Sequence, residues 1–190
     1  MRFLNKLICA ALLAPAAVLA APLYTADNKM AVPEDYRAWV FLTASMDLNY
    51  NTAATPGHHM LDNVFVNPEA YQVFLKTGTW PDKTILIKEN RMAESAGTLS
   101  KAGHFQGAVM NLEIHVKDEA RFPNGKWAFF LSSDGKAAGT LFPQTANCYS
   151  CHQDHATVDT TFVQFYPTLM PIAKEKNTLS AAYLKEIVAK

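Results

Sequence analysis

The pentapeptide Cys148-Tyr149-Ser150-Cys151-His152 constrains this chain more than any other stretch of it. Two cysteines separated by two residues and followed at once by a histidine form the attachment sequence of a c-type haem. On a short helical turn the two thiols reach the two vinyl groups of one porphyrin edge, and the adjacent imidazole ligates the iron. The rest of the chain is therefore expected to surround one haem.

Two other chemistries use a Cys-x-x-Cys pair. A thioredoxin-like redox motif is expected in a βαβ context, and a zinc site needs two further ligands nearby. His155 could supply one such ligand, but no further cysteine follows the pair. The sequence therefore favours covalent haem attachment at Cys148 and Cys151, with His152 as the iron ligand.

The first twenty residues have the pattern of a secretory signal peptide. Arg2 and Lys6 are basic, and Leu7–Leu19 is an apolar run of thirteen residues, too short to span a bilayer. Cleavage after Ala20 leaves residues 21–190, a length that suits one haem domain with its own core.

Charge and cysteine content limit the classes of partner. Removal of residues 1–20 changes the balance from 17 basic and 17 acidic groups to 15 and 17, a formal charge of −2. We therefore expect neither nucleic acid nor a membrane surface as a partner. Only the two motif cysteines remain, so no disulfide framework is expected. The bacterial periplasm, where c-haem is attached after export, fits these features.

Apolar and turn-forming residues before the motif predict an α+β fold rich in strands and hairpins. Asn67-Pro68-Glu69 predicts the start of a helix over 68–76 that ends before Gly78. Asn124-Gly125 predicts a hairpin connection, and the tail over 158–189 has helical spacing. Strands are predicted over 37–46, 61–66, 84–94, 105–116 and 127–132.

The late position of the motif argues against two common c-haem folds. Small electron-transfer cytochromes have the motif near the N-terminus, whereas only 38 residues follow His152 here. The helical-bundle c′ cytochromes have helices before the motif, where this chain has predicted strands. Met170 could be a second iron ligand, but an apolar helix residue is the expected role.

Several blocks of the chain, in order, resemble the cytochrome P-460 family, which also contains the c′-β cytochromes. The resemblance implies a mainly antiparallel sheet with a few helices, one haem c against the sheet, and His152 as its sole protein ligand. It also implies frequent homodimers. The blocks are DYRAWVF, VFVNPEAYQVFLKTGTWPDKTILIKEN, KWAFF, CYSCH and FVQFYPTL, and the resemblance extends over nearly the whole of residues 21–190.

An iron with one histidine ligand and an open sixth position binds small molecules. The resemblance implies two alternatives. Enzymatic members cross-link a strand lysine to the porphyrin edge, oxidise hydroxylamine to nitric oxide or nitrous oxide, and pass electrons to a small soluble cytochrome. The c′-β members lack the cross-link, line the distal face with phenylalanine, and bind nitric oxide or carbon monoxide without turnover.

Lys88 lies where the cross-linking lysine is expected. Strand alternation places it on the same face as Thr84 and Leu86, where an inward lysine is costly unless it is paired or bonded. Alternatively, the strand frays and Lys88 reaches solvent. Asp62-Asn63 stands where the hydroxylamine-oxidising members have a distal arginine, and Gly139–Asn147 contains no acid, so a slower or different reaction is also open.

Other residues are candidates with ordinary alternatives. The His58-His59 pair is expected to be solvated. A third class is a plain electron carrier, in which Met170 or this histidine pair supplies a second protein ligand to the iron. Four aromatic residues are candidates either for a distal cap or for core packing: Phe41, Phe65, Phe74 and Phe105.

Overall fold

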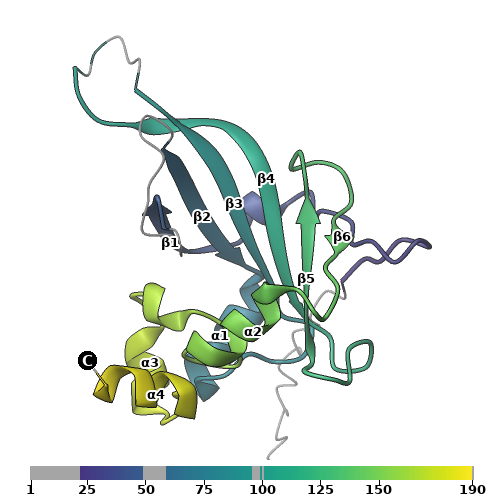
Figure 1. Ribbon diagram of the computed structural model, residues 1–190, viewed down its shortest axis with the longest axis vertical. Helices are drawn as coiled ribbons and strands as arrows, with labels where there is room; N and C mark the ends of the chain where they lie inside the picture. The colour runs from purple at the N-terminus through teal and green to yellow at the C-terminus, as the bar shows by residue number, and fades with distance from the viewer. Residues whose placement is uncertain (1–21, 49–58, 96–98, 100, 190) are drawn as a thin grey trace, which may run out of the picture.

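The computed structural model describes residues 22–48, 59–95, 99 and 101–189 (Figure 1). The predicted signal peptide, residues 1–20, and His58 lie outside these ranges. Within them, no helix has the length and apolar character needed to cross a bilayer.

The strands form one antiparallel sheet in which each strand pairs with the next along the chain. This meander confirms the predicted α+β fold with a mainly antiparallel sheet. In the described residues its strands are β1 (Val40–Met46), β2 (Met60–Val66), β3 (Ile85–Glu94), β4 (Phe105–Lys117), β5 (Trp127–Ser132) and β6 (Thr140–Leu141).

The α-helices gather around one end of the sheet, and the far ends of β2, β3 and β4 extend beyond them (Figure 1). The helical elements are η1 (Tyr36–Ala38), α1 (Pro68–Thr77), α2 (Asn147–His155), η2 (Val163–Phe165), α3 (Met170–Glu175) and α4 (Ala181–Val188).

Alternation along the strands divides the core between the two faces of the sheet. On one face, which we call the helix face, Val66, Leu86 and Trp127 pack against residues of α1 and of the segment after α2. On the opposite face, Ile87 and Ile114 pack with the N-terminal arm, whose buried residues include Met30 and Tyr36.

Helix α1 begins at the predicted residue, Pro68, and ends at Thr77, one residue later than predicted, but it lacks the expected N-terminal cap. Gly78 ends it with a left-handed φ of 74°, which glycine adopts at little cost. Asn67 occupies the N-cap position, yet its side chain does not cap the helix. Its Oδ1 instead accepts the N–H of Ile85 at 2.8 Å, which joins the helix start to β3.

Three local differences from the sequence prediction concern short elements. The predicted strand 37–46 begins at Val40, because the preceding residues form η1. The tail begins with a tight turn, bridged between Val158 and Thr161, before any helix. Strand β6, only two residues long, was not predicted.

Candidate haem site

Helix α2 carries the whole pentapeptide, in agreement with the helical turn that the motif requires. Cys148 and Cys151 are both free thiols and both partly buried. Residues three apart lie on the same side of a helix, so both thiols are on one side of α2. Burial raises the pKa of the Cys148 thiol, so it is held in the protonated form.

His152 is fixed in one tautomer by the backbone. Its Nδ1 lies 2.7 Å from the carbonyl oxygen of Thr160. Because a carbonyl only accepts hydrogen bonds, Nδ1 carries the proton and Nε2 keeps its lone pair. Burial lowers the pKa of His152, which also favours the neutral ring. A neutral imidazole with a free Nε2 is the form that binds iron.

The turn that presents the Thr160 carbonyl is itself tightly held. Asp159 and Thr160 both have left-handed backbones, with φ of 51° and 59°. The buried Lys117 of β4 donates to Asp159 Oδ2 at 2.9 Å and to the Trp80 carbonyl at 2.7 Å. Trp80 Nε1 in turn donates to Thr161 Oγ1 at 2.8 Å. The sheet and Trp80 thus fix the turn on either side of Thr160.

Aromatic rings surround the His152 imidazole. Its ring centre lies 4.6 Å from that of Phe129, 5.0 Å from that of His115 and 4.3 Å from that of Phe162. His115 also stacks on Phe129 at 4.0 Å. Burial lowers the pKa of His115 well below its ordinary value, so this ring is neutral. Alternation in the KWAFF strand, with Trp127 and Phe129 on one face, is the sequence signal that could have identified this wall.

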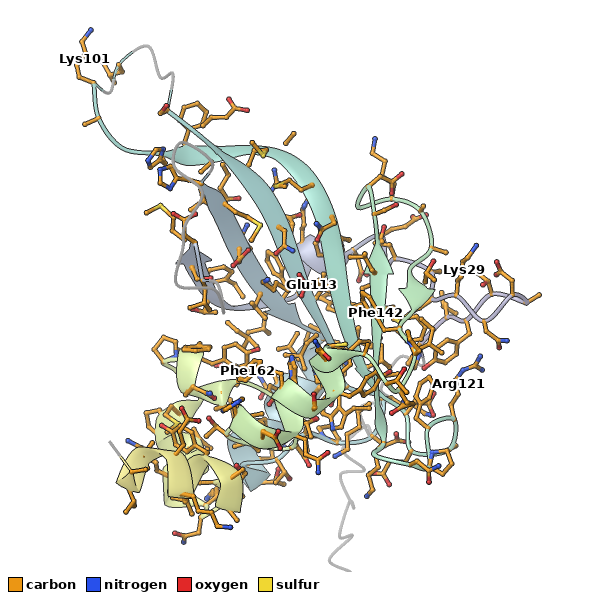
Figure 2. The ribbon with its side chains drawn as sticks, viewed as in Figure 1. Lys29, Lys101, Glu113, Arg121, Phe142 and Phe162 are labelled. Carbon is orange, nitrogen blue, oxygen red and sulfur yellow. The ribbon has the colours of Figure 1, made fainter. Side chains whose placement is uncertain are left out.

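Lys88 lies on the helix face, as alternation predicted, and it keeps its strand pairing with Val64 and Glu113. Its Nζ is 3.3 Å from Glu113 Oε1 and 3.8 Å from Asp62 Oδ1, and its side chain is 30% exposed. The lysine is therefore paired with carboxylates of both neighbouring strands. Figure 2 shows Glu113 on the sheet just above α2.

Three buried polar atoms on this face have no hydrogen-bond partner among the described residues: Asp62 Oδ1, Asn90 Oδ1 and His115 Nε2. A buried polar atom without a partner is costly and uncommon, and it often marks a group that is missing. Apolar residues of the helix face lie beneath the helices, whereas Asp62, Lys88 and Glu113 lie farther along the strands. The charge of Glu113 raises the pKa of His152 and the charge of Lys88 lowers it. Both effects are smaller than the effect of burial.

These features fit a haem. Two thiols lie on one side of a helix, the adjacent imidazole has a free Nε2, and unpartnered polar atoms lie on the sheet beside it. Within the part of the chain that the structure describes, no group of three or more histidine, cysteine or acidic side chains is arranged to hold a bare metal ion.

The four phenylalanine candidates take core or surface positions. Phe41 and Phe65 contact each other, and Phe65 contacts Tyr36 on the face opposite to Lys88. Phe74 packs on Trp80 with ring centres 4.3 Å apart. Phe105 begins β4 and is 46% exposed. None of Phe41, Phe65 and Phe74 therefore lines the wall around Lys88.

The remaining candidate ligands also have other partners. His59 Nδ1 lies 2.6 Å from Asp47 Oδ2, at the start of β2. Met170 begins α3 and packs against the core of the helix face, as expected for an apolar helix residue. His155 lies at the end of α2, where its Nδ1 is 3.2 Å from Glu186.

Comparison with known proteins gives one result. The family model described as Cytochrome P460 matches residues 33–163, more than half of the chain. The matched range runs from the residues before η1 through the whole sheet and α2 to the turn that contacts His152. A search of curated proteins gives no match.

Proposed function

The chain belongs to the cytochrome P460 family, and from this premise we propose that it is an exported monohaem c-type cytochrome that oxidises hydroxylamine. Family membership implies a haem cofactor and bound iron. A single haem, covalent attachment and a periplasmic location are parts of the proposal. They are supported by the single Cys-x-x-Cys-His motif and by the signal-peptide pattern of residues 1–20.

Cys148 and Cys151 would hold the haem through thioether bonds, and His152 would bind its iron through Nε2. The bound haem supplies the redox-active metal and the conjugated ring. The chain's own residues define its surroundings. The Thr160 carbonyl orients the His152 ring, and Phe129 and Phe162 keep water away from it.

The observation that carries the catalytic proposal is the placement of Lys88. Its ammonium group is held between Asp62 and Glu113, on the same sheet face as the residues that contact His152. We assign Lys88 as the residue that is joined to the porphyrin edge. Before Nζ can form a bond to carbon, the ammonium group must lose a proton, and either carboxylate is close enough to accept it. The new N–C bond replaces one N–H bond and one C–H bond of the porphyrin edge, so the step also releases two protons and two electrons, and an added two-electron oxidant such as a peroxide must accept these electrons.

The same carboxylates suit the proton balance of the reaction. Oxidation of NH₂OH to NO releases three protons and three electrons, and two NH₂OH give N₂O, water, four protons and four electrons. Burial raises the pKa of Asp62, an effect that Lys88 opposes, so Asp62 is a stronger proton acceptor than an exposed carboxylate. Glu113, whose side chain is 49% exposed, can pass protons to solvent. The electrons leave to a small soluble cytochrome.

The alternative, a gas-binding protein without turnover, calls for an apolar distal wall. Phe41 and Phe65 lie on the opposite face of the sheet, and the wall around Lys88 is polar. These placements favour the enzymatic reading over binding of nitric oxide or carbon monoxide alone.

The test uses purified holoprotein, hydroxylamine and a dye acceptor without oxygen. We expect dye reduction with three or four electrons for each nitrogen product molecule, and loss of this activity in Lys88→Met. Lys83→Met is the matched control. Lys83 Nζ lies 2.5 Å from Asp118 Oδ1, and this pair is away from the motif. Absence of dye reduction by the wild-type protein would refute the proposed activity.

Peptide mapping tests the cross-link separately. After proteolysis of the folded haem protein, the Lys88 peptide should be found only in a form that carries the haem mass. The ferrous Soret band should lie well to the red of that of Lys88→Met. Recovery of the unmodified Lys88 peptide from the wild-type protein rules out the cross-link.

Location and assembly are tested by simpler measurements. The proposal expects the mature chain, beginning at Ala21, in the periplasmic fraction of a bacterial host. A homodimer is expected by size-exclusion chromatography with light scattering. Neither membrane nor nucleic acid is expected to co-purify with the protein.

A further inference from the structure

Two buried oxygen atoms on neighbouring strands have no hydrogen-bond donor in the part of the chain that the structure describes. Asp62 and Asn90 are direct partners in the β2–β3 ladder, with 0% and 2% of their surfaces exposed. Directly paired side chains of antiparallel strands have Cβ atoms about 5 Å apart. The Oδ1 atoms of both residues have no hydrogen-bond partner among the described residues.

The position of each Oδ1 is fixed by hydrogen bonds that the second polar atom of the same carboxylate or amide group makes. Asp62 Oδ2 accepts the Ser45 hydroxyl at 3.0 Å. Asn90 Nδ2 donates to Asn111 Oδ1 at 2.7 Å and to Glu113 Oε1 at 2.8 Å. The two Oδ1 acceptors are therefore oriented in advance, and the remaining polar groups do not use them.

Lys88 does not satisfy the pair. Its Nζ is 3.8 Å from Asp62 Oδ1, beyond hydrogen-bond distance, and it lies closer to Glu113. A lysine joined to a porphyrin would be still less free to approach Asp62. Among the described residues neither Oδ1 accepts a hydrogen bond, and the ion pair with Lys88 at 3.8 Å offsets only part of the cost of burying Asp62.

We infer that the Asp62–Asn90 pair is a subsite for a small neutral ligand that carries N–H or O–H donors on both of its heavy atoms. Such a ligand can turn one atom to the haem side and donate from the other atom to Asp62 Oδ1. Hydroxylamine and hydrazine have this chemistry. Nitrite, nitric oxide and carbon monoxide have no donor, so the subsite selects against them. This inference rests on the proposed function, because it names the class of substrate that the same site takes.

Asp62 carries the larger part of the discrimination. A hydrogen bond to a charged acceptor is stronger than one to the neutral Asn90 amide oxygen. Loss of a charge-assisted hydrogen bond weakens binding by about tenfold or more. Asp62 is therefore the residue to change, with Ser45 as a milder second site because Ser45 only orients the carboxylate.

The experiment compares two probes that differ in donors at one end. Hydrazine, H₂N–NH₂, has donors on both nitrogens, whereas 1,1-dimethylhydrazine has them on one. Their affinities for the ferric holoprotein are measured from the visible spectrum, without oxygen or an electron acceptor. The quantity of interest is the ratio of the two affinities, in wild type and in each variant. Haem content and thermal unfolding verify that each variant is folded.

We expect Asp62→Leu to lower this ratio about tenfold or more, and Ser45→Ala to lower it by a smaller factor. Asp118→Asn is the matched control, a buried carboxylate that pairs with Lys83, and it should leave the ratio unchanged. If folded Asp62→Leu and Ser45→Ala both keep the wild-type ratio, water alone fills the subsite and the inference is wrong.

Failure of the proposed function looks different. In that case the ratio still falls in Asp62→Leu, while hydroxylamine gives no dye reduction with wild-type protein. The binding subsite would then stand without the oxidation.

Discussion

The Nδ1 atom of His152 and the carbonyl oxygen of Thr160 are 2.7 Å apart. In the proposed haem site, this contact leaves Nε2 as the nitrogen that would bind the iron, and it would strengthen the imidazole as an electron donor. The turn over 157–161 is consequently part of the proposed haem site, although none of its residues is in the Cys-x-x-Cys-His motif.

We expect Asp159→Asn to loosen this turn, because it removes the charge that pairs with Lys117 at 2.9 Å. The unfolding free energy should fall by about 1–3 kcal/mol. The haem reduction potential should rise, and the iron–histidine stretching band in the ferrous resonance Raman spectrum should move to lower frequency. Lys117→Met should act in the same direction.

Lys83→Met is the control for this prediction, since Lys83 pairs with Asp118 and does not contact the turn. A fall in stability with an unchanged potential and an unchanged Raman band would show that the Lys117–Asp159 pair is only structural.

Gly78 allows a test of how closely the end of α1 packs against the segment that follows α3. A Cβ atom at this position would lie 2.7 Å from Lys176 Cβ and 2.9 Å from Thr178 Oγ1, on a backbone with φ of 74°. We expect Gly78→Ala to lower the unfolding free energy by about 2 kcal/mol or more, from strain and collision together. Urea unfolding measures the change.

Gly125→Ala separates the two causes, because Gly125 has φ of 91° but nothing within 4 Å of a Cβ atom. It should lose only the strain part, about 1 kcal/mol. Equal losses in the two variants would show that the approach to Lys176 costs nothing.

The environment of Glu89 predicts that the protein loses stability at low pH. Burial alone raises its pKa, but hydrogen bonds from Arg91, Tyr36 and Arg37 outweigh burial and lower the pKa from 4.5 to about 2. Because the folded state binds the proton less readily, this stabilisation is present above pH 4.5 and is lost as the pH falls towards 2.

Glu89→Gln should therefore lose about 2–4 kcal/mol at pH 7 and show a flatter stability curve between pH 4.5 and 2. Urea unfolding at several pH values measures both effects. Glu175→Gln alters an exposed carboxylate on α3 and should follow the wild-type curve. An unchanged slope in Glu89→Gln would show that Glu89 is not the cause of the loss of stability at low pH.

The proposed attachment of haem through two thiols predicts that covalently bound haem is lost in steps. Either Cys148→Ala or Cys151→Ala alone should keep one thioether bond, and haem should stay with the chain on a denaturing gel. The double variant should keep haem on the denatured chain only through the proposed Lys88 cross-link, so the further change Lys88→Met should release all the haem to acidified organic solvent. Complete release of haem from the double cysteine variant would contradict the Lys88 cross-link, and haem retained by the triple variant would show that a further residue also holds it.

Local signals predicted most of the fold correctly. The Asn67-Pro68 start and the Gly78 end bounded α1, and alternation placed Lys88 on the correct face of β3. Such features depend on neighbours in sequence, which a single chain displays. The agreement of the predicted strands with β2, β3, β4 and β5 has the same cause.

Contacts between distant segments were not predictable in the same way. Lys117 meets Asp159 across 42 residues, and Phe162 reaches His152 only because the 157–161 turn folds back. Asn67 was predicted to cap its helix, but Ile85, the first residue of β3, has a buried N–H that bonds to the same oxygen. The Asp62–Asn90 pair likewise needed the strand register, which places the two residues directly opposite each other.

The order of the strands in the sheet has a consequence for biosynthesis. Each strand pairs with its predecessor, and the last one ends at Leu141, before α2 begins at Asn147. A chain made from its N-terminus can therefore close every ladder of the sheet from segments already emerged, at a small cost in loop entropy. The two motif cysteines emerge after the last of these strands, so the haem would be attached to a chain whose sheet has already formed.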